Sequence, residues 1–257
     1  MSTTTPLPAQ VQVITCNNPS AMTLEGTNTY LVGAGDAAEM TVVDPGPDGH
    51  PEHLQAIVEA AGDHRIAEIL ITHRHRDHVG AAAALRRRTG APIRAFDREL
   101  CAAAEPLTDG ERLSAAGVEV VVVHSPGHTS DSVCFWLPQQ QAMITGDTIL
   151  GRGTTMLDFP DGTLTDYLAT LEKLAQYDTA MVLPAHGPAG APLRPVAQQY
   201  RQHRQQRLEQ VSGLLDEHGD LTAEEVGRLV YGEDSAVDDR ILTLIAAAQL
   251  AHLRAVR

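Results

Sequence analysis

LITHRHRDHVG, residues 70–80, places three histidines and one aspartate within six positions. An apolar segment precedes this stretch and an alanine-rich segment follows it. His73 and His75 alternate in an extended segment, so both imidazoles project to the same side. Asp77 and His78 follow at the start of a predicted helix and point at a second position nearby. The stretch therefore predicts metal-binding side chains gathered at the end of a strand.

Three further loops carry polar side chains of the same type directly after apolar runs. HSPGH, GD and PAHG follow predicted strands at 118–123, 142–145 and 180–183, and they contribute His128, Asp147 and His186. Because α/β sheets place their ligand sites beyond the C-terminal ends of strands, four such loops can surround one point. Imidazole and carboxylate ligands without cysteine favour zinc, with iron or manganese as alternatives.

These candidate ligands are too many for one tetrahedral ion. Shared between two ions through one bridging carboxylate, they form two open-sided sites about 3.5–4 Å apart. His124, also in HSPGH, has no vacant ligand role and is interpreted as a structural histidine or as support for a ligand. Asp44, in VVDPG, is either a turn residue or a carboxylate that orients a ligand histidine.

The composition favours a globular enzyme over a nucleic-acid or membrane protein. At 257 residues with 43% hydrophobic residues, the chain can form one large α/β domain and a small appendage. The formal charge of -14 argues against a general polyanion binder. The N-terminal segment lacks a signal-peptide pattern, no apolar run spans a membrane, and the three cysteines form no C-x-x-C pair. We therefore expect a cytoplasmic protein without a membrane partner.

Strand and helix patterns alternate as far as a Pro- and Gly-rich segment at 184–195. Beyond it the pattern is helical, which predicts a catalytic domain over 1–195 and a helical module over 196–257. Helices are also predicted from about Pro51 to Ala61, ending at Gly62, and over 78–89, ending at Gly90. Candidate helix N-caps are Thr163, Thr222 and Ser235.

The chain resembles the metallo-β-lactamase superfamily over roughly residues 10–190. The motifs that carry the resemblance are H-x-H-x-D-H at 73–78, SPGHT at 125–129, GD at 146–147 and AHG at 185–187. The resemblance implies an αββα sandwich of the α/β (α+β) class. It further implies one metal held by His73, His75 and His128, a second held by Asp77, His78 and His186, and a bridging Asp147.

A finer resemblance is to the β-lactamase-like-protein-2 subfamily, which includes a single-strand-preferring endoribonuclease. It is carried by EGTNTYLVG (25–33), HRDH (75–78), GDTILGRGTT (146–155) and the HR pair at 203–204. The subfamily has a small C-terminal winged-helix-like module, which the helices of 196–257 match. This chain ends soon after the third of these helices and leaves little sequence for a β-wing. We therefore do not expect the module alone to bind nucleic acid.

The predicted reaction is hydrolysis of a small ester, thioester or lactam-type substrate by a metal-bridging hydroxide, with two Zn²⁺ ions per chain. Asp77 is the predicted catalytic carboxylate, which orients the attacking water or accepts its proton. Arg152, Thr154 and Thr155 are candidate contacts for a substrate anion, although GRGTT also fits a glycine-shaped turn.

Two other reactions compete with this prediction. One is a metal-dependent phosphodiesterase or endoribonuclease acting on single-stranded RNA, and the other is a mononuclear iron persulfide dioxygenase. A purely binding protein is disfavoured, because two open-sided metals would then have no reaction to catalyse. The C-terminal helices carry apolar stripes that must be buried against the main domain or against a second copy, so a homodimer is a further expectation.

Overall fold

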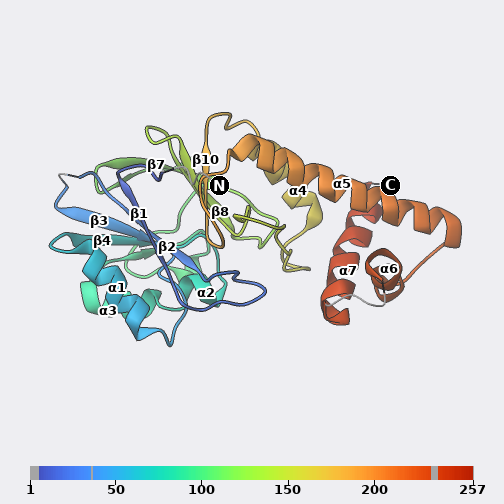
Figure 1. Ribbon diagram of the computed structural model, residues 1–257, viewed down its shortest axis with the longest axis horizontal. Coiled ribbons are helices and arrows are strands. Elements are labelled where there is room, and N and C mark those ends of the chain that lie inside the picture. The colour runs from blue at the N-terminus through green and yellow to red at the C-terminus, as the bar shows by residue number, and fades with distance from the viewer. Residues whose placement is uncertain (1–5, 36, 233–236, 257) are drawn as a thin grey trace. The chain divides into compact units, whose positions relative to one another are not determined.

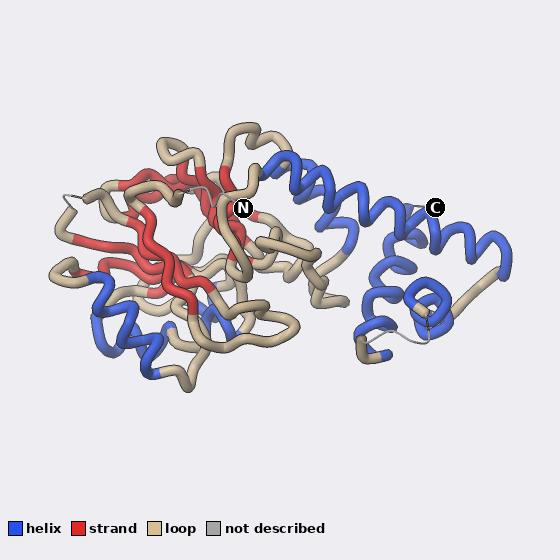
Figure 2. The backbone as a smooth tube through the Cα atoms, in the orientation of Figure 1, coloured by secondary structure: helices blue, strands red, loops and turns tan. Residues whose placement is uncertain are grey.

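The structure, a computed structural model, describes residues 6–35, 37–232 and 237–256. The chain forms two compact units (Figure 1). The first unit comprises Met1–Ser125, Asp131–Thr155 and Asp178–Leu193, and the second comprises Pro126–Ser130, Met156–Tyr177 and Arg194–Arg257. All the named strands belong to the first unit. Figure 2 draws these strands in red. No helix in the described ranges combines the length and the apolar character needed to cross a membrane.

The compact units differ from the predicted domains at three segments. The unit of the C-terminal helices also includes Pro126–Ser130, Met156–Tyr177 and Arg194–Pro195, which the sequence-based division placed in the first domain. Compactness and independent folding are separate properties, so the boundary between residues 195 and 196 stays a prediction.

The first sheet has the strand order β1-β2-β3-β4-β5. Its strands are β1 (Val11–Thr15), β2 (Asn28–Val32), β3 (Glu39–Val43), β4 (Arg65–Leu70) and β5 (Ile93–Arg94). β2 pairs with β1 and β3 in antiparallel register, while β4 pairs with β3 and β5 in parallel register. Parallel neighbours need a crossover connection, and helix α1 (Pro51–Ala61) lies between β3 and β4 in the chain.

The second sheet has the strand order β10-β9-β8-β7-β6. Its strands are β6 (Arg112–Ala115), β7 (Val118–His124), β8 (Val133–Leu137), β9 (Ala142–Gly146) and β10 (Met181–Pro184). β10 is parallel to β9, and the other neighbours are antiparallel. The sequence did not predict β6, because its four residues RLSA give too short an apolar alternation.

The main core lies between the two sheets. Tyr30 and Val32 of β2 contribute to it together with Val122 of β7 and Phe135 of β8, all of which are buried. Leu31, the residue between Tyr30 and Val32, belongs instead to a second cluster. Since alternate side chains of a strand face opposite sides, β2 is covered on both faces. The two mixed sheets confirm the predicted α/β class.

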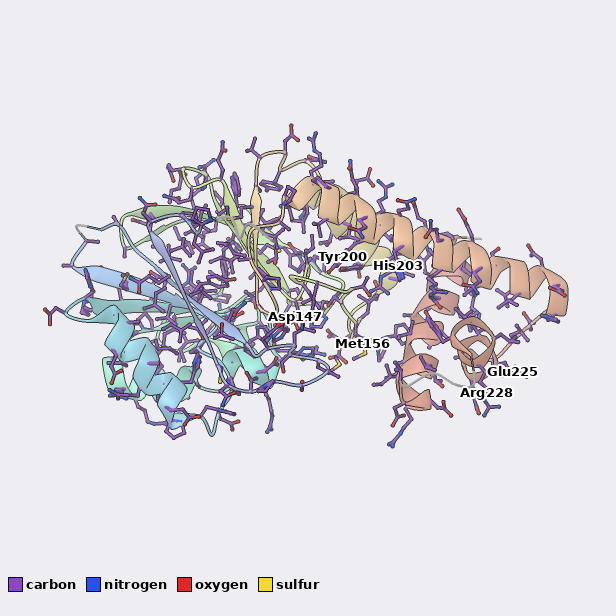
Figure 3. All side chains as sticks on the ribbon, viewed as in Figure 1. Asp147, Met156, Tyr200, His203, Glu225 and Arg228 are labelled. Atoms are coloured by element: carbon purple, nitrogen blue, oxygen red, sulfur yellow. The ribbon has the colours of Figure 1, made fainter. Side chains whose placement is uncertain are left out.

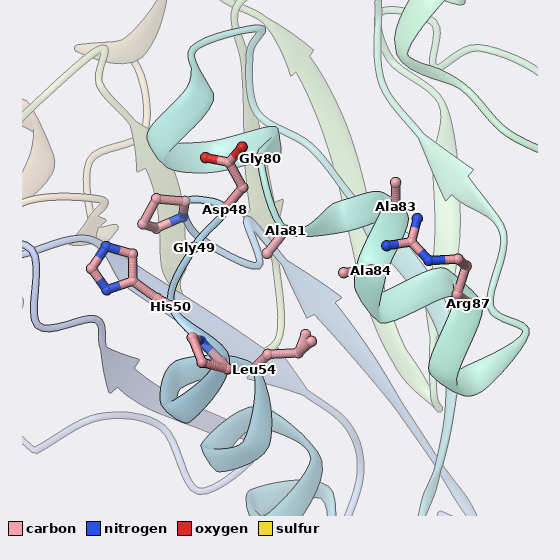
Figure 4. Close-up of a pocket in the computed structure, with 11 residues that line it drawn as sticks. Asp48, Gly49, His50, Leu54, Gly80, Ala81, Ala83, Ala84 and Arg87 are labelled. Atoms are coloured by element: carbon pink, nitrogen blue, oxygen red, sulfur yellow. The ribbon is translucent and has the colours of Figure 1, made fainter.

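Helices α1 and α3 (Ala82–Thr89) cover the outer face of the first sheet (Figure 1). Ile57 of α1 and Leu85 of α3 pack in the second cluster with Ile69 of β4. A short 3-10 helix, Arg98–Leu100, follows β5. An open cavity of about 430 Å³ lies between the two helices, with His50 and Arg87 on opposite sides of it (Figure 4).

The single helix predicted over 78–89 is wrong, since the structure has two helices there. Helix α2 (Arg76–Val79) ends before Gly80, and α3 begins at Ala82. The backbone N–H of Ala81 donates to the carbonyl of Gly46 at 2.9 Å instead of continuing the helix. A Cβ at position 80 would lie 2.5 Å from the backbone nitrogen of Asp48. Close approach of the loop after β3 therefore interrupts the helix. As a result, α2 and α3 are separate helices.

The second unit is helical, with α4 (Leu164–Leu174), α5 (Leu193–His218), α6 (Ala223–Tyr231) and α7 (Asp239–Val256). Val211, Val226 and Ala246 form part of a core shared by the last three helices. The Thr163 side chain accepts from the backbone of Asp166, and Thr222 forms the predicted capping box with Glu225. The predicted N-cap Ser235 lies outside the described residues.

Candidate metal centre

The ligand-type side chains of the first unit follow the C-terminal ends of parallel strands. β3 and β4 are parallel neighbours, and β9 and β10 are as well. The strand ends are followed by Asp44 after β3, His73 after β4, Asp147 after β9 and His186 after β10. The N-cap of α2 is His75, whose φ of -64° and ψ of 144° are extended. The extended segment and the helix start were both predicted.

The first ligand group contains His73, His75 and Asp147, whose ligand atoms all lie within 4.8 Å of one another. Nε2 of His73 lies 3.1 Å from Nδ1 of His75 and 4.0 Å from Oδ2 of Asp147. His73 is buried and His75 is partly exposed. The group therefore offers two ring nitrogens and one carboxylate oxygen to a single point.

The second ligand group contains Asp77, His78 and His186, again with ligand atoms within 4.8 Å of one another. Nε2 of His186 lies 3.2 Å from Oδ2 of Asp77, and Nε2 of His78 lies 3.5 Å from the same oxygen. Both histidines are buried, while the Asp77 side chain is 27% exposed. The carboxylate is thus the solvent-accessible member of this group.

The two oxygens of Asp147, which is labelled in Figure 3, face different ligand groups. Oδ2 is the oxygen nearest His73. Oδ1 lies 3.2 Å from Nε2 of His186 and 3.6 Å from Nε2 of His78. One carboxylate therefore has an oxygen directed at each group, which is the arrangement a bridging ligand requires.

Asp44 contacts histidines of both ligand groups, one directly and one through Thr72. Its Oδ2 accepts a hydrogen bond from Nδ1 of His78 at 2.8 Å. The same oxygen accepts from the Thr72 hydroxyl at 2.6 Å. Since that hydroxyl proton is committed to Asp44, the Thr72 oxygen must accept from Nδ1 of His73, 3.0 Å away. Both rings therefore present Nε2 to their ligand group.

Asp44 combines the two roles that the sequence left open. Its φ of 51° is the left-handed conformation of a turn residue. Its carboxylate is buried and also accepts from the backbone N–H of Thr72 at 2.8 Å. Thr72 itself was not predicted as a site residue, although it is the residue directly before His73 in THRHRDH.

His186 is held from the opposite side of its ring. Nδ1 donates to the carbonyl of Gly26 at 3.1 Å, so Nε2 faces Asp77 and Asp147. The backbone of His186 also forms a bridge with Thr27, and its carbonyl accepts from Gly151 at 2.8 Å. Loops from distant parts of the sequence thus fix the ring and the backbone together.

The electrostatics around the histidines of the second group favour a bound cation. Burial lowers the pKa of His78, but the charges of Asp147 and Asp44 outweigh burial and hold that pKa well above its ordinary value. Burial likewise opposes protonation of His186, whose hydrogen bonds with Asp147 and Asp77 raise its pKa to about 9. The surroundings therefore favour protons on these histidine nitrogens. A metal ion can take the place of those protons.

The carboxylates of the two groups show the complementary shifts. Burial raises the pKa of Asp147, but the charge of His78 and the hydrogen bond from His186 lower it well below its usual range. For Asp77, burial is opposed by a hydrogen bond from His186 and by the charge of His78, and the pKa is lowered. Among the described residues, the buried Nε2 of His78 makes no hydrogen bond. A buried nitrogen that faces two ionised carboxylates fits a metal ligand.

His128 belongs to the second unit, in the segment Pro126–Ser130. Its Nδ1 donates to the carbonyl of Met156 at 2.5 Å, which leaves the lone pair of the neutral ring on Nε2. The flanking residues Ser125 and Asp131 belong to the first unit. The role of His128 as a ligand stays a prediction.

The remaining candidates are not members of the two ligand groups. The His124 ring stacks on Phe96 with centroids 4.0 Å apart and planes at 6°, which matches a structural histidine. Arg152 contacts Glu25. Thr154 is exposed and Thr155 is buried. The structure therefore places Arg152 and Thr154 at the surface, where a substrate could reach them.

The family follows from a comparison with known proteins. A family model described as the metallo-beta-lactamase superfamily matches residues 22–186. The chain belongs to this superfamily. The resemblance predicted from the H-x-H-x-D-H, SPGHT, GD and AHG motifs is thereby confirmed, and so is the fold class. Together with the His/Asp cluster, membership makes the chain a metal-dependent hydrolase of the metallo-β-lactamase fold.

Individual relatives align over most of the chain. It is 33% identical over 226 residues to the beta-lactamase-like protein 2 homolog of Caenorhabditis elegans, an alignment that covers 84% of this chain and 75% of that protein. It is 35% identical over 240 residues to an atrochrysone carboxyl ACP thioesterase of Aspergillus novofumigatus (strain IBT 16806), covering 88% and 72%. A metallo-beta-lactamase family protein from Thermus thermophilus has a TM-score of 0.80 at 22% identity, covering 97% and 94%, and shows the shared fold.

Proposed function

We propose that the chain hydrolyses a small ester or thioester at a pair of zinc ions. The observation that carries the proposal is the placement of Asp147, whose two oxygens face different ligand groups. A site for one ion would need neither the second group nor a shared carboxylate. Iron and manganese are compatible with the same donors, and zinc is proposed because the donors are imidazole and carboxylate without cysteine.

Seven side chains would hold the two ions. His73, His75 and His128 would bind one ion, Asp77, His78 and His186 the other, and Asp147 both. When bound, such a pair lowers the pKa of a water molecule towards neutrality and polarises the substrate oxygen.

The chain's own residues supply orientation and proton transfer. Asp44 fixes the ring of His78 directly and that of His73 through Thr72, so neither ring needs to reorient when an ion binds. The Asp77 carboxylate is ionised at neutral pH, because its pKa is lowered, and it is partly exposed. We propose that it orients the attacking water and accepts its proton.

An acyl substrate is favoured by charge and by one relative. The formal charge of -14 opposes binding of a long polyanion such as RNA. The Aspergillus relative is named as a thioesterase acting on an acyl carrier protein, and thioesters are therefore the first substrates to test. We propose the thioester or ester as the substrate class, with lactams as chemically similar acyl compounds.

The test is a hydrolysis panel on protein of measured metal content. We expect turnover of thioesters and aryl esters, loss of turnover after chelation, and recovery with about two equivalents of zinc. The panel also includes a chromogenic lactam, a bis-aryl phosphodiester, single-stranded RNA and a persulfide. Turnover confined to the phosphodiester and RNA would replace the acyl proposal with the nuclease, and oxygen consumption with the persulfide on one iron would replace it with the dioxygenase.

A further inference from the structure

A cavity of the first unit adjoins the candidate metal centre. It measures about 340 Å³ and is lined by Thr15, Glu25, Asn28, Arg152, Gly187 and Pro188. This volume lies in the range of small-molecule sites. Gly187 directly follows the candidate ligand His186, so the cavity lies next to the backbone that carries this ligand.

The backbone that positions His186 also positions Arg152. Gly151 donates to the carbonyl of His186 at 2.8 Å. A Cβ at Gly151 would lie 2.4 Å from the carbonyl oxygen of Pro188, so only glycine allows this approach. The GRGTT loop is thus a glycine-shaped turn, as one prediction had it, and the same turn carries Arg152 to the edge of the cavity. The two interpretations of this loop are compatible.

The neutral polar groups of the cavity are engaged within the wall. The Asn28 amide donates to the carbonyls of Pro184 and Gly187 at 2.9 and 3.1 Å. Its oxygen accepts from the Thr15 hydroxyl at 2.7 Å. These hydrogen bonds hold the wall together. The ion pair of Arg152 and Glu25 at the rim is therefore the part of the cavity that can still bind a ligand.

That pair consists of Arg152 and Glu25, whose side chains are 52% and 57% exposed. The Arg152 guanidinium forms an ion pair and a hydrogen bond with the Glu25 carboxylate. The hydrogen bond from Arg152 lowers the pKa of Glu25, so the carboxylate is ionised at neutral pH. A guanidinium has five N–H donors, more than one carboxylate can occupy. Exposed ion pairs are weak, so a ligand anion can share Arg152 with Glu25 or displace it.

We propose that the Arg152–Glu25 pair selects substrates that carry an anionic group, a carboxylate or a phosphate, at the end remote from the acyl bond. The inference rests on the hydrolase function proposed above and names the substrate class of that site. Arg152 binds the anion. Glu25 holds the guanidinium at the rim when no substrate is present and competes with the anion for it.

Two matched esters test this selection. The p-nitrophenyl ester of valerate and the mono-p-nitrophenyl ester of glutarate share a leaving group and chain length, and only the glutarate ester ends in a carboxylate. Arg152→Ala should lower kcat/KM for the glutarate ester about tenfold, through KM, and leave the valerate ester within about twofold. Arg152→Lys should retain part of the preference, and Glu25→Gln should lower KM for the glutarate ester alone.

The Arg112–Glu119 ion pair is a matched control, since Arg112 is also exposed and both residues lie in the strands β6 and β7. Arg112→Ala and Glu119→Gln should leave kcat/KM unchanged for both esters. An equal loss on both esters in Arg152→Ala would show a structural role and overturn the proposal. A ratio of kcat/KM for the two esters that is the same in Arg152→Ala as in the wild type would overturn it as well.

A binding measurement separates this inference from the proposed hydrolysis. Calorimetry with the non-hydrolysable anilides of valerate and glutarate should show tighter binding of the glutarate anilide to the wild-type holoenzyme, and no preference in Arg152→Ala. Competition by inorganic phosphate and by acetate, compared between the same two proteins, separates a phosphate from a carboxylate preference. Arg152-dependent binding without turnover of either ester would contradict the hydrolase alone. Turnover without an Arg152-dependent preference would contradict the inference alone.

Discussion

The two ligand groups differ in how the chain holds their histidines. In the second group, His78 and His186 are both buried, and Nδ1 of each ring donates directly to an oxygen of the first unit, from Asp44 and Gly26. In the first group, His73 is buried but reaches Asp44 only through the Thr72 hydroxyl. His75 is partly exposed.

The third predicted ligand of the first group, His128, belongs to the other compact unit. Because both of its histidines are buried and hydrogen-bonded directly, the second group is the better preorganised of the two. Rigid, hydrogen-bonded ligands lose less conformational entropy when an ion binds. We therefore expect the second position to bind its metal more tightly. The following predictions test that difference.

Among the variants that test this difference between the groups, the largest effect is expected for Asp44→Asn. Asparagine has the same shape and tolerates the positive φ of 51°, but it removes the charge that holds His78. Zinc affinity at the second position should fall about 10–100-fold, as measured by competition with a chelating dye. The exposed neighbour variant Asp48→Asn should bind like the wild type. Equal zinc affinities for the wild type and both variants would show that the Asp44 charge does not support metal binding.

Thr72→Val should act on the first position only. It removes the hydroxyl between Asp44 and His73 and leaves the direct contact of Asp44 with His78 intact. We expect zinc affinity at the first position to fall about tenfold, and Thr72→Ser to restore it. The same dye titration resolves the two binding steps. A serine variant as weak as the valine variant would show that packing matters here and the hydroxyl does not.

The burial of His53 leads us to expect that folding stability depends on pH. This buried ring donates from Nε2 to the Thr29 hydroxyl at 2.8 Å, and burial lowers its pKa to about 4 from an ordinary value of 6.5. The neutral ring is favoured in the folded state, so its contribution is complete above pH 6.5 and is lost as the pH falls towards 4. The loss should be on the order of 3 kcal/mol.

Urea unfolding of metal-free protein between about pH 7 and pH 4 measures this contribution. His53→Gln keeps a donor for Thr29 but cannot titrate, so its stability should fall less over the same range. Parallel pH profiles for the two proteins would contradict the assignment.

The smallest effect is expected for His124→Leu. The ring stacks on Phe96 and lies outside both ligand groups, so its removal should cost about 1 kcal/mol of folding stability. Metal content, measured by elemental analysis, should stay at the wild-type value. Metal loss comparable to that of the Asp44 variant would show that His124 supports a ligand.

The site was predictable from sequence where a residue's chemistry is visible in a motif. The alternation of His73 and His75 and the placement of candidate ligands after strands pointed to residues that the structure brings together, and the family resemblance supplied their division into two groups. Thr72 was missed because a threonine before the motif has an ordinary strand composition. Its role depends on Asp44, which lies 28 residues earlier and reaches Thr72 only because β3 and β4 pair in the folded sheet.

The fold was predictable where the apolar pattern is long and regular. α1 was predicted with the bounds that the structure has, because Pro51 and Gly62 mark its ends. The break between α2 and α3 was missed because it depends on a tertiary hydrogen bond from Ala81 to Gly46. The predicted homodimer and the cytoplasmic location are untested and stay predictions.

Metal stoichiometry in the wild type and in Asp147→Ala tests the central claim most directly. If Asp147 is shared by the two ligand groups, wild-type protein purified without chelator and supplemented with zinc should hold about two ions per chain by native mass spectrometry. Asp147→Ala should hold fewer than one and should lose hydrolytic activity at the same time. A wild type that stays at one ion, or an Asp147→Ala variant that keeps two, would contradict the shared carboxylate.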